Sequence, residues 1–84
     1  MPFDLKEFGR RLQAARLEHE WTQEELAQRL EASRTWISEL EKGRQVSLRA
    51  ATVVRFAEAL GVSADYLLGL TDSPTPAARR RVRA

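Results

Sequence analysis

The sequence predicts an all-α fold of five short helices, on three observations. Apolar residues recur at three- and four-residue intervals through most of the first 70 residues, which is the spacing of one face of a helix. Serine, threonine and glycine, residues that begin or end helices, separate these segments. No segment shows the apolar–polar alternation of a β-strand. We therefore expect a compact helical domain.

The first helix is expected from about Leu5 to about His19. Phe8, Leu12 and Ala15 continue an apolar stripe from Leu5 at helical intervals. This stripe predicts an amphipathic helix.

The second helix follows Thr22, in the segment "TQEELAQRLE". Thr22 and Glu25 have the spacing of a capping box, and Trp21 with Leu26 can form the hydrophobic staple beside it. The expected buried side consists of Leu26, Ala27 and Leu30. Because only two residues separate this helix from the next N-cap candidate, the second and third helices must turn sharply against each other.

The third helix lies in "ASRTWISELEKG", with Ser33 as the N-cap and Gly43 as the C-terminal stop. Only Ile37 and Leu40 form an unambiguous apolar line, three residues apart. A helix with so narrow a buried stripe leaves most of its surface for another molecule.

Two more helices are expected before residue 70. Ser47 is the N-cap candidate of the fourth, which Gly61 ends, and Ser63 caps the short fifth, with Asp65 in its first turn. The apolar face of the fourth helix consists of Leu48, Ala51, Val53, Phe56, Ala57 and Leu60.

Charge divides the chain into a domain, residues 1–70, and a basic tail, residues 71–84. The domain carries ten Lys/Arg and eleven Asp/Glu, whereas the tail carries four arginines and one aspartate. Two prolines and small polar residues in the tail predict disorder. There is no cysteine and no apolar run long enough to span a bilayer, so we expect a cytoplasmic protein.

The second and third helices have the order of a helix-turn-helix, whose second helix lies in the DNA major groove. Four segments in succession, "FGRRLQAAR", "WTQEELAQRL", "SRTWISELEKG" and "AEALGVSADYLLG", resemble the Cro/phage-repressor-type helix-turn-helix family over about Phe8 to Leu70. The resemblance implies a five-helix, lambda-repressor-like domain. It also implies a transcriptional regulator, most simply a repressor or autoregulator, that binds an inverted repeat of double-stranded DNA as a homodimer.

The exposed face of the third helix supplies the candidate base-reading residues, Arg34, Thr35, Ser38 and Glu39. Arginine can bind guanine O6 and N7 together, threonine can contact the thymine methyl, and glutamate can accept from cytosine N4. The alternatives are a solvated Arg34 and a Glu39 that is only a surface carboxylate repelled by phosphates.

Backbone contacts are expected on both sides of the reading face. Gln23 and Thr22 lie where the second helix begins, and free backbone N–H groups there can meet a phosphate. The other candidates are Trp36, Lys42, Arg44 and Gln45. Trp36 could instead pack against the second helix, and the last three could be ordinary loop residues.

The resemblance also implies an ion pair between Arg16 and Glu41 that ties the first helix to the end of the third. Its alternative is two solvated charges. The chain departs from the family where a glycine commonly ends the first helix, because Glu20 stands there, and a non-glycine left-handed residue costs about 1–2 kcal/mol. The loop before the fourth helix lacks the usual proline and is one residue longer.

The dimer interface is expected at the fifth helix. Leu67 should face the core, so Tyr66 and Leu70 would share an exposed stripe with Val62 and Val54. Alternatively, Tyr66 only covers the core of a monomer.

Other functions have weaker support in the sequence. An enzyme is not expected, because the single histidine, His19, has no partner triad, and there is no phosphate-binding loop or metal-ligand cluster. No cofactor is expected. A protein-interaction module, or an antitoxin bound to a toxin, is the alternative, since the domain without its tail has no net positive charge. The tail could add phosphate contacts or only increase solubility.

Overall fold

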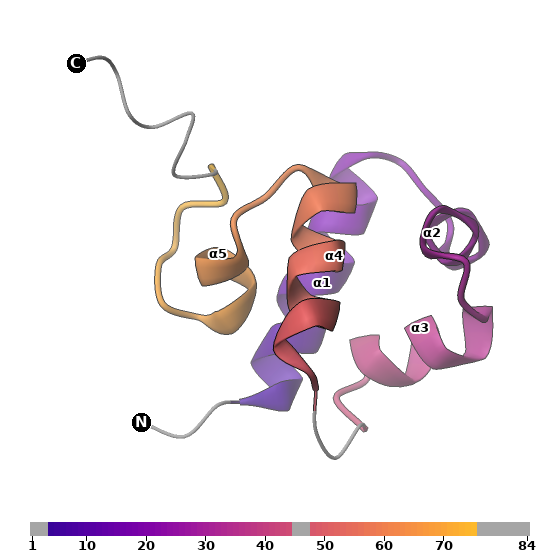
Figure 1. Ribbon diagram of the computed structural model, residues 1–84, viewed down its shortest axis with the longest axis horizontal. Helices are drawn as coiled ribbons and strands as arrows, with labels where there is room; N and C mark the ends of the chain where they lie inside the picture. The colour runs from indigo at the N-terminus through magenta and orange to yellow at the C-terminus, as the bar shows by residue number, and fades with distance from the viewer. Residues whose placement is uncertain (1–3, 45–47, 76–84) are drawn as a thin grey trace.

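The computed structural model describes residues 4–44 and 48–75. Within these two ranges the chain forms five α-helices and no strand, as predicted (Figure 1). None of these helices is long and apolar enough to cross a membrane. Their bounds are α1 Leu5–Glu18, α2 Gln23–Leu30, α3 Arg34–Glu41, α4 Ala50–Leu60 and α5 Ala64–Leu68.

Most helix starts follow the predicted capping chemistry. Thr22 and Glu25 form the capping box of α2, and the hydroxyls of Ser33 and Ser63 accept from backbone N–H groups in the first turns of α3 and α5. Asp4, which the sequence did not single out, caps α1 by accepting from the N–H groups of the first turn. Each of these caps supplies partners for N–H groups that a helix start leaves unpaired.

The start of α4 differs from the prediction. Its N-cap is Arg49, which makes no side-chain capping hydrogen bond, and the first helical residue is Ala50. The predicted cap, Ser47, lies outside the described residues. Leu48 therefore precedes the helix instead of belonging to its apolar face. The predicted stop is present, because Gly61 is the left-handed C-cap of α4.

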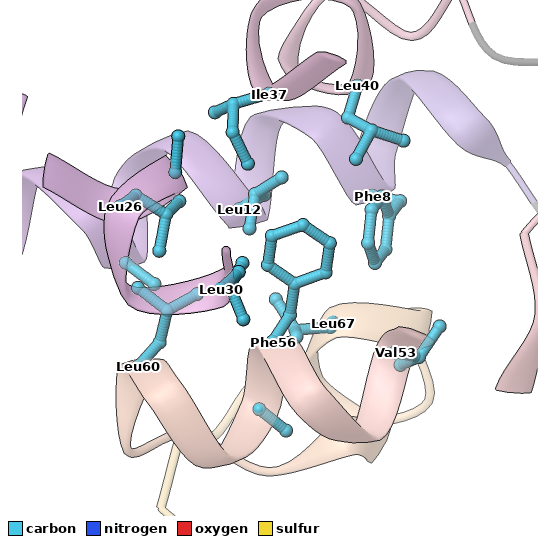
Figure 2. Packing of buried hydrophobic residues seen from close by; sticks show 13 residues of the cluster. Phe8, Leu12, Leu26, Leu30, Ile37, Leu40, Val53, Phe56, Leu60 and Leu67 are labelled. Carbon is cyan, nitrogen blue, oxygen red and sulfur yellow. The ribbon is translucent and has the colours of Figure 1, made fainter. Parts of the chain in front are cut away.

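The helices form two groups around a central pair. In Figure 1, α4 crosses α1 at the centre, α2 and α3 lie together on one side, and α5 lies on the other. The core is continuous across all five helices, as Figure 2 shows: Phe56 of α4 points between residues of α1 and α2, and Ile37 and Leu40 reach in from α3. Leu67 of α5 is fully buried, as predicted.

Gly9 permits the close crossing of α1 and α3. A Cβ atom at this position would lie 2.5 Å from the carbonyl oxygens of both Leu40 and Glu41. Backbone atoms cannot yield as a flexible side chain can, so any larger residue would push the C-terminal end of α3 away. A single hydrogen atom in place of a side chain thus fixes the distance between the two helices.

Arg11 attaches the chain after α5 to α1. Its guanidinium donates to the carbonyl oxygens of Tyr66 (2.9 Å) and Thr71 (2.6 Å) and to the carboxylate of Asp72 (2.9 Å). A further bond joins the Ser63 N–H to the Pro74 carbonyl at 2.9 Å. Residues 71–75, assigned above to the tail, therefore contact the domain, whereas residues 76–84 lie outside the described part.

The same arginine also pairs with Glu7, one turn earlier on α1. Hydrogen bonds from Arg11 and then from Arg10 lower the pKa of the Glu7 carboxyl below its usual value. The carboxylate in turn raises the pKa of Arg11, which stays charged at all ordinary pH values. The Glu7–Arg11 pair is thus part of the attachment of the chain end.

Candidate nucleic-acid interface

The turn between α2 and α3 is short and fixed by backbone hydrogen bonds. Glu31, the C-cap of α2, is left-handed with a φ of 54°, and the Ala32 N–H returns to the Ala27 carbonyl at 2.9 Å. Ser33 then begins α3 at once. Leu26 and Leu30 of α2 pack in the same core as Ile37, so the two helices hold each other at a fixed angle.

The four predicted base-reading residues lie on α3 but are not equally exposed. Arg34 and Thr35, in its first turn, are exposed, whereas Ser38 and Glu39 are half-buried. Ile37 and Leu40 anchor the opposite side of the helix. The N-terminal end of α3 is consequently the part that stands furthest out, and in helix-turn-helix proteins this end contacts base edges.

A chain of hydrogen bonds joins the exposed Arg34 to a buried ion pair. Arg16 donates to both carboxylate oxygens of Glu41, at 2.6 Å to Oε2 and 3.0 Å to Oε1. Gln23 Nε2 donates to the same Oε1 at 3.0 Å, and Gln23 Oε1 accepts from Arg34 Nη1 at 3.4 Å. The orientation of the Gln23 amide, and with it the position of Arg34, is thus set from inside the domain.

The Arg16–Glu41 pair is desolvated on both sides. The side chains are 8% and 2% exposed, and Arg16 Nη1 also donates to the Trp21 carbonyl at 2.7 Å. Such a pair adds little net stability over apolar residues, but its geometry is demanding. Because Arg16 is on α1 and Glu41 ends α3, the pair fixes the end of α3 against the centre of the domain.

Glu39 has a cationic neighbour in the following loop. Arg44 Nη1 lies 3.6 Å from Glu39 Oε2, and the Arg44 side chain is 63% exposed. The carboxylate is therefore partly neutralised on the face expected to meet phosphates. Lys42, the C-cap of α3, is exposed near by. Gln45, the remaining candidate in this loop, lies outside the described residues.

Trp36 is less exposed than expected for a residue that contacts the DNA backbone. Its ring stacks on Phe56 with the centroids 5.6 Å apart, and the side chain is half-buried. The ring therefore packs on α4, a partner that the alternative above did not name. Trp36 thus supports α3 from the side. Of the other predicted backbone contacts, Thr22 is exposed and lies next to Gln23 at the start of α2.

The four predicted interface residues do not form one stripe. Val62 and Tyr66 line a hollow beside α1, where the Arg11 guanidinium lies 4.6 Å above the Tyr66 ring. Val54 lies in a different groove, between α4 and α5, and Leu70 is 73% exposed. The predicted stripe assumed a regular helix through residue 70. Because α5 ends at Leu68 with a left-handed Gly69, Leu70 does not continue the helical spacing.

The groove between α4 and α5 is lined by apolar residues and has a volume of about 280 Å³. Its lining consists of Leu48, Ala50, Val53, Val54, Ala64 and Leu68. Leu68 is 37% exposed and was not among the expected interface residues, although the crowded segment "YLLGL" indicates that not all of its large side chains can be buried. Its lining residues come from α4, α5 and the residues just before α4, and none comes from α3.

The described residues hold no candidate metal centre, since no group of three or more His, Asp or Glu side chains is suitably placed there. His19, the single histidine, stacks on Trp21 with ring centroids 4.1 Å apart, and its Nε2 lies 2.6 Å from the Leu60 carbonyl oxygen. These contacts give it a packing role at the junction of α1, α2 and α4.

Comparison with protein families and solved structures gives a consistent result. A family model described as a helix-turn-helix domain matches residues 7–70. Comparison with curated proteins gave no match. The restriction-modification controller protein C.AhdI from Aeromonas hydrophila has a similar structure, with 28% identity and a TM-score of 0.70, over 76% of this chain and 96% of that one.

Two further solved structures are similar. The hypothetical transcription factor NHTF from Neisseria is 28% identical with a TM-score of 0.72, over 92% of this chain and 80% of that one. The clp gene regulator ClgR from C. glutamicum is 29% identical with a TM-score of 0.71, over 81% of this chain and 87% of that one.

Proposed function

Since this chain belongs to the helix-turn-helix domain family, we propose that it is a sequence-specific transcription regulator that binds double-stranded DNA with α2 and α3. The first turn of α3 enters the major groove, where Arg34 binds a guanine and Thr35 contacts the next base. Ser38 and Glu39 read further along the groove. Thr22 and Gln23 bind a phosphate at the N-terminus of α2.

The observation that carries this proposal is the hydrogen-bonded chain from Arg34 through Gln23 to the Arg16–Glu41 pair. A merely solvated arginine needs no such support. A side chain that must donate two parallel hydrogen bonds to one base gains from being oriented before it binds, because less rotamer entropy is then lost. The same argument applies to Gln23, whose second amide proton remains available to a phosphate.

The positive charge that meets the phosphates comes from the ends of the site. Lys42 and Arg44, together with Gln45, follow α3 and contact one strand of the backbone. Arg44 leaves Glu39 when it binds a phosphate, since their pair is exposed and weak. The freed Glu39 carboxylate then accepts from a cytosine amine.

The protein acts as a homodimer on an inverted repeat. One reading helix covers too few base pairs for a specific address, so two copies are required. What supports a contact at the apolar groove between α4 and α5 is the exposure of Val54 and Leu68 beside it and the absence of any α3 residue from its lining. Dimerisation there leaves both reading helices free, about 34 Å apart.

Repression or autoregulation is the simplest outcome, because a dimer on an operator excludes polymerase without any further domain. Acting on DNA, the protein works in the cytoplasm. The test is selection of binding sites from a random double-stranded DNA pool with the full chain, followed by binding at several salt concentrations. An enriched inverted repeat, bound with a steep salt dependence, is expected. Failure to enrich any site would favour a protein partner, such as a toxin, instead.

A further inference from the structure

A second hollow lies on the side of the domain away from α3. It has a volume of about 410 Å³ and lies where the C-terminal ends of α1 and α4 meet the chain that follows α5. Most of its walls are small or apolar, namely Ala14, Ala15, Leu60, Gly61, Val62 and Pro74. A hollow of this size and composition can receive a few residues of an extended peptide.

One acidic side chain lines this hollow, and two more lie close in sequence to its lining residues. Glu18 lines it and is exposed. Glu20 follows Glu18 by two residues, and Glu58 precedes the lining residue Gly61 by three. Among residues 4–44 and 48–75, no cation lies within ion-pair distance of any of these three carboxylates. The hollow thus combines an apolar floor with negative charge.

The chain leaves the described part of the structure at the wall of this same hollow. Pro74 and Thr75 are among its lining residues, and the Ser63–Pro74 hydrogen bond and the Arg11 contacts fix them there. The next nine residues, "PAARRRVRA", contain four arginines and no acid. Fully extended, the four residues from 76 to Arg79 span about 14 Å, which is enough to bring an arginine to the acidic edge.

We propose that residues 76–84 bind back to this hollow, with the small residues Ala77 and Ala78 on its apolar floor and the arginines paired with Glu18 and Glu58. Each pair is weak on the surface, but the tether gives the segment an effective concentration in the millimolar range. When little DNA is bound, the docked segment keeps its four arginines away from DNA phosphates. The arginines then exchange between the domain and nonspecific DNA as salt and DNA concentration change.

The absence of cysteine from the chain makes a clean test possible. A spin label on Ala84→Cys broadens the amide signals of residues near it in the NMR spectrum of the full chain. At low salt, broadening is expected at Glu18, Gly61 and Val62 and is lost at high salt. A sample that mixes ¹⁵N-labelled unmodified protein with spin-labelled ¹⁴N protein should show none of it, because the contact is within one molecule.

Paired variants test the charges. Glu18→Gln/Glu58→Gln should abolish the broadening, whereas Glu24→Gln/Glu31→Gln, which removes the same charge from exposed sites on α2 and its C-cap, should preserve it. Broadening at Arg34 and Thr35 in place of the hollow would overturn the proposal. So would broadening in the mixed sample, equal effects of the two variant pairs, or no broadening at any salt concentration.

Discussion

Gln23 donates a hydrogen bond of 3.0 Å to Glu41, the buried carboxylate that also holds Arg16. The side-chain amide of Gln23 consequently has one orientation, with its oxygen toward Arg34. The Glu41 carboxylate therefore stabilises the fold through Arg16 and orients the proposed recognition residues through Gln23. A change at Glu41 is expected to alter both, whereas a change at Arg34 should alter recognition alone.

Arg34→Ala should relax base preference and weaken binding to the best site by about 1–3 kcal/mol, because a bidentate contact with guanine is lost. Gln23→Ala should weaken binding to all sites, because it removes the proposed phosphate contact. It should relax base preference less than Arg34→Ala does, because Arg34 then loses only its support. Binding measured across a randomised operator library distinguishes the two. Arg10→Ala, which removes an equally exposed arginine on α1, serves as the control and should leave the sequence preference unchanged. If Arg34→Ala also leaves it unchanged, Arg34 does not read a base.

Arg16→Ala and Glu41→Ala should each reduce the free energy of unfolding by about 3–5 kcal/mol, since each leaves one buried charge without its partner. The double variant should lose less than the sum of the single losses. Urea unfolding of the four members of this cycle provides the measurement. Strictly additive losses would show that the two charges do not interact in solution.

Val54→Ser/Leu68→Ser should convert the proposed dimer to a monomer at micromolar concentration, because both residues border the apolar groove. Sedimentation velocity measures the change. Leu17→Ser is the matched control, since Leu17 is 55% exposed on α1, outside the groove, and its loss should leave the dimer intact. Equal effects of the control and the groove variant would place the interface elsewhere.

Glu7→Gln should lower the melting temperature near neutral pH and make it less sensitive to acid. The folded-state pKa of Glu7 is lowered by Arg11 and Arg10. Its ionised form therefore stabilises the fold at pH values above the ordinary glutamate pKa of about 4.3. This contribution is lost as the pH falls through the lower, folded pKa. The melting curves of the two proteins should therefore converge in acid. A constant difference at every pH would contradict the assignment.

Glu20→Gly should raise the free energy of unfolding by about 0.5–1 kcal/mol. Glu20 has a φ of 59°, in the left-handed region where glycine is not strained, and the gain is reduced by the greater freedom of glycine in the unfolded chain. Chemical unfolding measures it. Glu24→Gly, inside α2, is the control and should destabilise by about 1 kcal/mol. A loss of stability in Glu20→Gly would mean that the Glu20 side chain contributes more than its backbone costs.

The fold was predictable because its signals are local. The stripe through Phe8, Leu12 and Ala15 and the caps at Thr22 and Ser33 each act within a few residues, so periodicity and spacing reveal them. The start of α4 was misplaced because Ser47 is a good cap by type. Residue type alone does not decide at which residue the loop ends and the helix begins.

The candidate site was predictable only in part. The position of Arg34 on the open face of α3 follows from its spacing to Ile37. Its support by Gln23 does not, because that contact joins two helices whose relative angle depends on the whole core. The packing of Trp36 on Phe56 and the separation of Tyr66 from Val54 depend on distant contacts in the same way, and these were the features that sequence reasoning placed less well.

The glycine at the crossing of α1 and α3 limits how the protein can change its target. With a backbone contact at Gly9, position 9 offers no substitution that shifts α3 by a small amount, so the tilt of the recognition element cannot be tuned gradually there. Under the proposed function, new operator preferences then arise from exchanges at Arg34, Thr35 and their exposed neighbours, while the arrangement of the helices stays unchanged. The domain is consequently a favourable scaffold for engineered specificity, in which the reading surface can be randomised while Gly9 and the helix it meets stay as they are.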